Sequence, residues 1–377
     1  MKLLHLSDLH LGKRVNEFSM LEDQKYILNQ ILQIVINEQV NTVLIAGDVY
    51  DKSVPSAQAV TLFDDFLTRL EALECTVLLI AGNHDSPERL AFGAHLLQKS
   101  RVYLSPVFDG RLTCCTLNDE YGQLDVWLMP FLKPSVVRPF YPEDTMESYQ
   151  DAAAVVLRSN PPHQGRRSIL VAHQFVTGAK TGGSEELSVG GAENIDAALF
   201  AAYDYVALGH IHSPQRVGRE TVRYCGSPLK YSLSEARGTK SVTLITFNQP
   251  GEIDIKLCPL TPLHDLRTIR GTYDEVTART FYEGTATDDY LHITLTDETE
   301  VLDAVGKLRS IYPNVMRVDY DNTRTRAGAS MPEATVQDEA TPMELFCRFF
   351  EWQNEKPLTE RQRALLEKEI EAVWEER

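Results

Sequence analysis

The segment at residues 76–85 constrains the fold more than any other part of the chain. It begins as a continuous apolar run (TVLLIA) and then changes at Gly82 to Asn83, His84 and Asp85. A short apolar run of this kind is typical of a strand buried on both faces of its sheet. Open α/β sheets bind their ligands beyond the carboxyl ends of their strands. The segment therefore predicts a reaction site at the end of a buried strand.

Two similar segments precede it in the chain. Residues 3–7 form an apolar run that leads to Asp8, and residues 41–47 form another that leads to Asp48. Amphipathic helices are expected between the strands, over 19–38 and 56–73. Alternating strands and helices imply parallel pairing with right-handed crossovers, so all three strand ends should meet at one edge of a sheet.

The pattern changes after about residue 101. Shorter strands are expected at 112–117, 124–131, 168–172 and 205–208, which favours a second sheet. A chain of 377 residues is also too long for one compact core. We expect a first domain over residues 1–260, a small α/β domain over 262–321, a polar linker over 322–340 and a helical segment over 341–377.

Composition narrows the possible classes of protein. The chain has 43% hydrophobic residues and a net charge of −17, which argues against a large basic surface for nucleic acid. No apolar run approaches the ~18 residues that a membrane-spanning helix needs. The six cysteines include no Cys-x-x-Cys pair. This pattern predicts free thiols in a reducing cytoplasm rather than disulfides or a zinc site.

Seven donors of the kind that bind metal ions follow predicted strands: Asp8, His10, Asp48, Asn83, His173, His210 and His212. Carboxylate, imidazole and amide oxygen without thiolate suit Mn²⁺, Fe²⁺ or Zn²⁺. Seven ligands are too many for one ion, and a carboxylate such as Asp48 can bridge two. A pair of ions about 3.5–4 Å apart can activate water and stabilise phosphoryl transfer. Each motif alone is weak, because aspartates and histidines are common in turns, but coincidence of all of them is improbable.

Taken together, these motifs resemble the calcineurin-like metallophosphoesterase superfamily. The matching residues are Asp8-x-His10, Gly47-Asp48, Gly82-Asn83-His84-Asp85, His173 and Gly209-His210-x-His212. The resemblance implies a four-layer αββα sandwich in the α/β class. It implies one ion held by Asp8, His10, Asp48 and His212, and a second held by Asp48, Asn83, His173 and His210. By the same resemblance, His84 stabilises the scissile phosphate and helps to protonate the leaving oxygen, and Asp85 orients His84.

A narrower resemblance covers the whole chain. The opening at residues 4–12 (LHLSDLHLG), the segment 225–228 (CGSP), the small domain and the helical tail are similar to the double-strand-break repair nucleases. That family implies a Mn²⁺-dependent exonuclease and endonuclease acting on DNA ends and hairpins, at the nucleoid. It also implies a homodimer of the nuclease subunit in a complex with two SMC-like ATPase subunits. Archaeal relatives carry a histidine where this chain has Asp51, so the phosphate contact of that histidine is not expected here.

Candidate residues for DNA and partner binding lie outside the metal motifs. For DNA they are Lys13, Arg14, Lys133, Lys180 and Ser227, beside the predicted site in sequence or in the 225–228 segment. Cations there would track the DNA backbone, or they could equally be solvated surface charges. For the partner they are Leu345, Phe346, Phe349, Phe350, Leu365, Leu366, Ile370 and Trp374. These side chains could pack on the small domain, but we favour their gripping a helix of the ATPase subunit.

Two other classes of function remain open from the sequence. A phosphomonoesterase or cyclic-nucleotide phosphodiesterase would use the same metals, but it would need neither the 262–321 domain nor the aromatic tail. A non-catalytic scaffold would have no reason to keep seven metal ligands. The chain lacks a Gly-x-x-x-x-Gly-Lys-[Ser/Thr] loop, so any use of ATP is assigned to the partner subunit.

Overall fold

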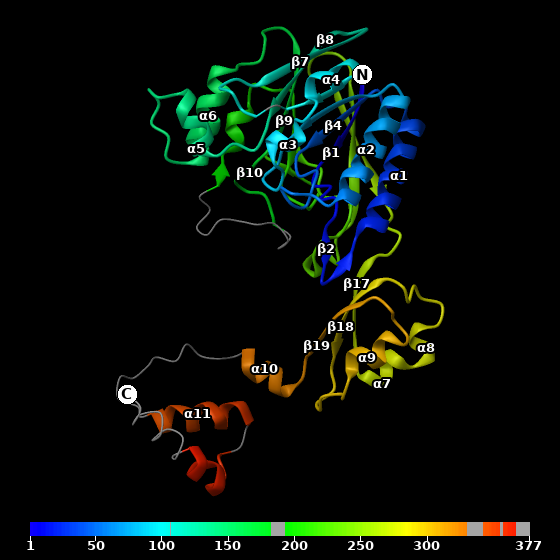
Figure 1. Ribbon diagram of the computed structural model, residues 1–377, viewed down its shortest axis with the longest axis vertical. Helices are drawn as coiled ribbons and strands as arrows, with labels where there is room; N and C mark the ends of the chain where they lie inside the picture. Colours follow the sequence, from blue (N-terminus) through cyan, green and yellow to red (C-terminus); the bar gives the residue numbers. More distant parts are fainter. Residues whose placement is uncertain (106, 182–192, 330–341, 355–356, 367–377) are drawn as a thin grey trace. The chain divides into compact units, whose positions relative to one another are not determined.

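A computed structural model describes residues 1–105, 107–181, 193–329, 342–354 and 357–366 (Figure 1). The chain divides into two compact units, Met1–Arg267 and Thr268–Arg377. Within the described ranges, every helix is too short or too polar to cross a membrane. All six cysteines are free thiols, as predicted.

The first sheet contains the three strands predicted from the sequence start. Its order is β16-β15-β1-β4-β5-β6. The strands are β1 (Lys2–Leu6), β4 (Thr42–Ala46), β5 (Thr76–Ile80), β6 (Val102–Leu104), β15 (Lys240–Phe247) and β16 (Ile253–Leu260). β1, β4, β5 and β6 are parallel, whereas β15 and β16 join as antiparallel strands. The helices α1 (Leu21–Glu38) and α2 (Ala57–Ala72) lie beside this sheet (Figure 1).

The second sheet has the order β13-β14-β12-β9-β8-β7. Its strands are β7 (Thr113–Asp119), β8 (Gly122–Met129), β9 (Arg167–His173), β12 (Tyr205–Gly209), β13 (Gln215–Val217) and β14 (Arg219–Tyr224). The central strands β8, β9, β12 and β14 are parallel. One face packs against α6 (Tyr149–Ser159) through residues such as Met129 and Val156. The other face supplies Val126 and Val171 to a core shared with Leu44 and Leu78 of the first sheet. The predicted four-layer sandwich is confirmed.

Helix capping follows the sequence in some places and departs from it in others. Ser56 caps α2 by accepting from the Ala59 N–H, and Ser148 forms a capping box with Asp151 at α6. Ser86-Pro87 is a sequence typical of a serine-capped helix start, but the Ser86 hydroxyl donates to the Glu88 carboxylate instead. The helix that follows, α3 (Pro87–Leu90), is a single turn and is succeeded by α4 (Ala94–Leu97). Short elements complete the unit: β2 (Arg14–Val15), β3 (Phe18–Ser19), α5 (Pro134–Val137), β10 (Phe175–Val176) and β11 (Asn194–Ile195).

The second unit is built around a three-stranded sheet, with the order β17-β18-β19. The strands are β17 (Leu266–Gly271), which crosses the unit boundary, β18 (Tyr290–Leu295) and β19 (Val315–Tyr320); the helices are α7 (Tyr273–Thr277), α8 (Arg279–Tyr282) and α9 (Ala304–Arg309). Leu291, Ile293 and Leu308 are among its buried core residues. This unit therefore has a hydrophobic core of its own.

The predicted linker at 322–340 begins with a helix, α10 (Thr323–Ala329), rather than irregular chain. Asn322 and Thr325 explain the difference, because their side chains accept reciprocally from each other's backbone N–H groups and start the helix. The tail then forms α11 (Pro342–Asn354) and a helical turn over 360–366. Residues 359–362 (TERQ) and 341–344 (TPME) both have the sequence pattern of a capping box. The reciprocal hydrogen bonds of Thr359 with Gln362 are present, whereas Thr341 lies outside the described residues.

Candidate metal centre

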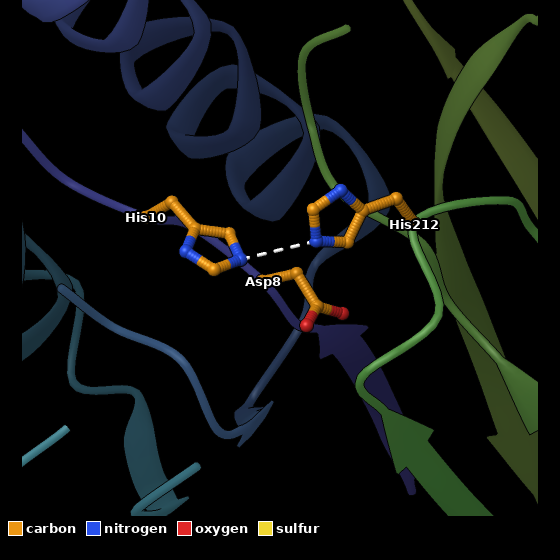
Figure 2. A group of neighbouring side chains, drawn as sticks. All are labelled: Asp8, His10 and His212. Carbon is orange, nitrogen blue, oxygen red and sulfur yellow. Dashed lines mark hydrogen bonds between the residues drawn. The ribbon is translucent and has the colours of Figure 1, made fainter. Parts of the chain in front are cut away.

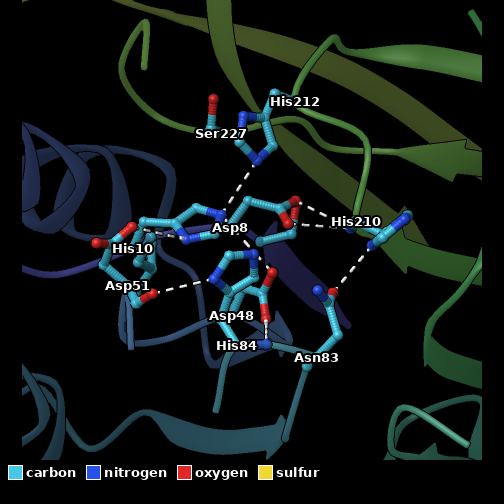
Figure 3. Close-up of polar contacts among 12 residues, drawn as sticks. Asp8, His10, Asp48, Asp51, Asn83, His84, His210, His212 and Ser227 are labelled. Carbon is cyan, nitrogen blue, oxygen red and sulfur yellow. Dashed lines mark hydrogen bonds and ion pairs between the residues drawn. The ribbon is translucent and has the colours of Figure 1, made fainter. Parts of the chain in front are cut away.

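The predicted ligands converge at the carboxyl ends of the parallel strands in both sheets (Figure 3). Asp8 and His10 follow β1, Asp48 follows β4 and Asn83 follows β5; His173 ends β9, and His210 and His212 follow β12. All of them are buried except Asn83, which is partly exposed. The seven side chains therefore come from the carboxyl ends of strands in two sheets rather than from the edge of a single sheet.

Two glycines permit the sheets to approach closely at this edge. A side chain at Gly47, whose φ is +85°, would overlap the His173 ring, and one at Gly209 would overlap the Ala46 carbonyl oxygen. Both glycines immediately precede a predicted ligand. The Gly-Asp and Gly-His pairs in the sequence therefore reflect contact between the two sheets as well as the chemistry of the ligands.

Four of the ligands have a left-handed backbone. Their φ angles are 52° at Asp8, 44° at His10, 50° at Asp48 and 105° at His210. Non-glycine residues rarely adopt positive φ, and such strain clusters at functional sites. Hydrogen bonds between the strand ends hold these turns, because the Asp8 N–H donates to Gly47 O at 3.1 Å and the His10 N–H donates to Asp48 O at 3.0 Å.

Asp8, His10 and His212 form the first group of donors (Figure 2). The Nε2 atoms of His10 and His212 face each other at 3.1 Å. The Asp8 carboxylate accepts from the His210 backbone N–H at 3.0 Å, which fixes its direction. Two imidazole nitrogens at this separation, beside a buried carboxylate, suit a cation placed between them.

Asn83, His173 and His210 form the second group. Nε2 of His173 and Nδ1 of His210 lie 2.9 and 3.0 Å from the Asn83 Oδ1 atom. Nδ1 of His173 donates to the Ala46 carbonyl at 2.8 Å, which turns its Nε2 atom toward the site. A backbone carbonyl that fixes the tautomer in this way is typical of metal-binding histidines.

Asp48 lies between the two groups. Its Oδ2 atom is 3.6 Å from His10 Nε2 and 3.3 Å from His173 Nε2. Its Oδ1 atom accepts from the His84 backbone N–H at 2.9 Å. One oxygen of Asp48 is therefore directed at both groups, as a bridging ligand requires.

Burial and mutual charge control the protonation of these groups. Burial alone would raise the pKa of Asp48, but the neighbouring His173 and His10 bring that pKa below its usual range. Burial lowers the pKa of His173, but Asp48 outweighs this effect and raises it to about 9. Burial raises the pKa of Asp8 and lowers that of His210 to about 3. No lysine or arginine in the described ranges forms an ion pair with Asp8 or Asp48. The residues therefore fit one or two divalent cations in charge and in donor type.

His84 lies at the rim of the centre. Its Nδ1–H donates to the Asp51 carbonyl at 3.0 Å, so Nε2 is the free end of the ring. One of its nitrogens is also close enough to His10 and Asp48 to make His84 a possible ligand. The Asp51 carboxylate pairs with Lys13 at 2.7 Å and lies 3.8 Å from His10 Nδ1. Asp51 thus contacts the His84 ring through its backbone and Lys13 through its side chain.

The structure corrects the role predicted for Asp85. Its carboxylate accepts from three backbone N–H groups, those of Gly82 at 3.0 Å, Val49 at 3.1 Å and Tyr50 at 2.9 Å. The His84 ring is held by Asp51 instead. Burial and nearby Asp48 raise the pKa of Asp85 to about 6, against the effect of these N–H donors. Asp85 therefore joins the loops after β4 and β5 rather than orienting the His84 side chain.

A buried ion pair lies behind His212, and sequence reasoning missed it. Glu235 ends the 3-10 helix η5 (Leu233–Glu235), and Lys240 begins β15. The two side chains form a short contact, and the Glu235 Oε1 atom lies 3.5 Å from His212 Nδ1. Burial would raise the pKa of Glu235, but His212 and Lys240 bring it to about 2. Glu235 follows no strand and belongs to no metal-binding motif, so no local signal pointed to it.

The residues predicted to bind DNA fall into different environments. Lys133 and Lys180 are exposed, and Arg14 is exposed with its guanidinium donating to Glu17 O. Lys13 is mostly buried in its ion pair with Asp51. Ser227 is fully buried, and its hydroxyl donates to Leu229 O and accepts from Lys240. The structure therefore places Ser227 behind the ligands (Figure 3), which contradicts direct DNA contact by its side chain.

The residues predicted to bind a partner are only partly described. Phe346 and Phe349 on α11 are 40% and 50% exposed, and Leu365 in the turn at 360–366 is 62% exposed. Phe350 and Leu366 are partly buried, and Leu345 lies on α11. Ile370 and Trp374 lie outside the described residues.

Another cluster of metal-type donors, the Cys114–Asp125–His163 group, lies away from the metal centre in the first unit. It comprises Cys114 of β7, Asp125 of β8 and His163. The Asp125 carboxylate accepts from the Thr116 hydroxyl at 2.6 Å and lies 2.6 Å from His163 Nδ1. The Arg166 guanidinium donates to it at 3.4 Å. Asp125 is thus already neutralised and hydrogen-bonded by the protein.

Comparisons with known proteins agree with this description. Residues 1–214 match the family model for calcineurin-like phosphoesterases, and residues 262–354 match that for the type 5 capsule protein repressor C-terminal domain. The chain is 32% identical over 355 residues to the SbcD subunit of the nuclease SbcCD from Staphylococcus epidermidis, which covers 92% of each protein. Solved structures with some likeness include a dimetal phosphatase from Danio rerio (11% identity, 70% of this chain and 98% of that chain, TM-score 0.42). A protein from Thermus thermophilus is also similar (11% identity, 68% and 98%, TM-score 0.39).

Proposed function

The chain belongs to the calcineurin-like phosphoesterases and, within them, to the SbcD family of nuclease subunits, and we propose that it cleaves DNA phosphodiester bonds with two divalent metal ions. At the coarser level it is a metal-dependent nuclease. The position of Asp48 carries the two-ion proposal, because one of its oxygens is directed at both groups of ligands. Among the ions that suit these donors, Mn²⁺ is the one that we propose, because the resemblance to the repair nucleases implies it.

The residues divide the chemistry among them. Bound ions would supply an activated water and neutralise the charge of the phosphate. Asp8, His10, Asp48 and His212 would hold one ion, and Asp48, Asn83, His173 and His210 the other. His84 keeps its Nε2 end free because Asp51 O accepts from Nδ1–H. We assign to Nε2, when the ring is protonated, the transfer of a proton to the leaving oxygen.

The proposed substrate is DNA at ends and hairpins, cut as exonuclease and as endonuclease. The proposed partner is the SMC-like ATPase SbcC, in a complex of two nuclease and two ATPase subunits working in repair and recombination at the nucleoid in the cytoplasm. The relative's printed name, which places that protein in SbcCD, supports the partnership. Exposed Phe346 and Phe349 on α11 offer apolar side chains for a partner helix.

One assay tests the function. The full chain is incubated with Mn²⁺, Mg²⁺ or a chelator, in parallel on hairpin duplex DNA and on a chromogenic phosphomonoester. We expect Mn²⁺-dependent cleavage of the hairpin and little turnover of the monoester. Rapid monoester hydrolysis with intact DNA would instead establish a phosphomonoesterase, and a cyclic-nucleotide substrate in a third arm would identify that alternative.

Deleting residues 342–377 tests the partnership. The shortened chain should lose SbcC in a pull-down while keeping Mn²⁺-dependent hydrolysis of a generic phosphodiester, because the metal ligands all lie before residue 213. A matched double variant, Phe346→Ala with Phe349→Ala, should weaken capture without removing any chain. Retention of SbcC by the shortened chain would contradict the assignment.

A further inference from the structure

We infer that Glu235 and Lys240 are positioning residues that set the ring of His212 so that its Nε2 atom faces the metal centre. The inference deepens the proposed function and rests on His212 being a metal ligand. Neither residue belongs to the strand-end motifs.

Glu235 faces the outer nitrogen of the His212 ring. Its Oε1 atom lies 3.5 Å from His212 Nδ1, and Oε1 has no hydrogen-bond partner within the described residues. The Glu235 side chain is buried, with 5% of the residue exposed. A buried carboxylate oxygen with no other partner is costly, so an N–H group on the adjacent imidazole is the donor it requires.

Lys240 holds both the carboxylate and the backbone of the ligand. Its Nζ atom donates to the His212 carbonyl at 2.8 Å, to the Ser227 hydroxyl at 2.7 Å and to the Glu235 carboxylate. The Ser227 N–H donates to the same His212 carbonyl at 3.1 Å. One ammonium group thus ties His212 in place at its main chain and, through Glu235, at its ring.

The contact with Glu235 determines which nitrogen of the His212 ring carries the proton. A neutral ring carries one N–H, and a carboxylate can only accept, so Glu235 selects the tautomer with the proton on Nδ1. The lone pair is then on Nε2, which faces His10 Nε2 at 3.1 Å (Figure 2). Metal-bound histidines commonly have such a carboxylate behind them, and its loss typically weakens metal binding 10- to 100-fold.

A purely structural ion pair is the competing explanation, and Asp119 with Arg167 provides the matched control. Arg167 is buried at the start of β9 and pairs with the partly exposed Asp119 at the end of β7, whereas His173 ends β9. Both partners of each pair are replaced together, because removing one partner alone would leave an unpaired buried charge. Only removal of the Glu235–Lys240 pair should change metal affinity.

The first measurement uses the metal-free full-length protein labelled with ¹⁵N-histidine. Long-range ¹H–¹⁵N spectra report the tautomer of each ring, and the His212→Gln variant assigns the His212 signals. We expect the proton on Nδ1 in the wild type and a mixture of tautomers in Glu235→Met/Lys240→Met. A wild-type ring with its proton on Nε2 would overturn the inference, whatever the protein's enzymatic activity proves to be.

The second measurement is Mn²⁺ affinity, read from the electron paramagnetic resonance signal of free Mn²⁺. Glu235→Met/Lys240→Met should bind Mn²⁺ about 10- to 100-fold more weakly, and Asp119→Asn/Arg167→Met should stay within about twofold. Glu235→Gln/Lys240→Met should recover much of the loss, because an amide oxygen can still accept from Nδ1–H. In a chain that already carries His212→Gln, adding Glu235→Met/Lys240→Met should not lower the Mn²⁺ affinity further. Equal losses in the Met and Gln variants, or an additive loss in that background, would leave only the structural role.

Discussion

The metal centre and the Cys114–Asp125–His163 group both bring together metal-type donors, and they differ in what already surrounds their carboxylates. In the metal centre, the contacts of Asp8 and Asp48 are backbone N–H groups and histidines. In the Cys114–Asp125–His163 group, Asp125 is held by Thr116, His163 and Arg166. An arginine beside a carboxylate supplies the positive charge that an ion would otherwise bring. Donor identity alone therefore does not define a metal site; whether an arginine or lysine already pairs with the carboxylate also matters.

The largest difference in metal affinity and activity is expected between variants of Asp48 and variants of Asp125. Asp48→Asn removes the bridging charge and should lower Mn²⁺ affinity and hairpin cleavage by about 1,000-fold or more, since two-ion catalysis depends on that bridge. Asp125→Asn should leave both within about twofold. The measurements are Mn²⁺ titration by electron paramagnetic resonance and initial cleavage rates. Loss of metal from Asp125→Asn would erase the distinction between the groups.

His84→Gln separates chemistry from metal binding inside the centre. We expect cleavage to fall by about 10²- to 10⁴-fold, as for loss of a general acid, with Mn²⁺ affinity near that of the wild type. The geometry also permits His84 to act as a ligand, and a parallel fall in affinity would assign it that role. Normal turnover on hairpin DNA would refute both.

Binding of metal ions should stabilise the fold through the metal centre and not through the Cys114–Asp125–His163 group. At a free Mn²⁺ concentration of about 100 times Kd, the ion adds about 2.7 kcal/mol to the free energy of unfolding. The thermal midpoint of the first unit should then rise by about 5–10 °C, and a chelator should reverse the shift. Cys114→Ser should show the same shift. Loss of the thermal shift in Cys114→Ser would instead place the ion at the Cys114–Asp125–His163 group and contradict the prediction.

The smallest expected effect is the pH dependence of the Asp125 contacts. Burial would raise the pKa of Asp125, but Thr116 and His163 bring it below its ordinary value. A carboxyl with a lowered folded pKa stabilises the protein above its unfolded pKa of about 3.9 and loses that effect as pH falls through the folded value. Asp125→Asn should therefore cost about 1–3 kcal/mol at pH 7 and less near pH 3, measured by denaturant unfolding at both pH values.

The strand-end ligands could be predicted because each follows a local apolar run. Asp8, Asp48 and Asn83 are each recognisable within ten residues of sequence, and parallel pairing then brings them together. Contacts that cross between distant segments carry no such signal. The family resemblance assigned Asp85 to the His84 ring, yet its carboxylate accepts from the backbone N–H groups of Val49 and Tyr50. Local pattern identifies which side chains lie at the edge, but not which way they point.

Local sequence patterns also failed to predict the role of Glu235 and the helix at the start of the predicted linker. Glu235 lies 23 residues beyond His212 in an ordinary polar stretch, and only the return of the chain into β15 brings it behind the imidazole. At Asn322 the polar composition suggested irregular chain, but one reciprocal pair of side-chain bonds with Thr325 starts α10. In both cases a few specific contacts outweigh the average character of the segment.

The close approach of the two sheets at Gly47 and Gly209 has a consequence for how this family can vary. A single methyl group at either position would wedge the layers apart before it touched any ion. Alanine scanning at these two positions would therefore imitate the loss of a ligand even though neither residue donates an electron pair. Ligands from the two sheets can reach the same ions only because neither glycine has a Cβ atom. These two positions should therefore tolerate substitution as poorly as the ligands themselves.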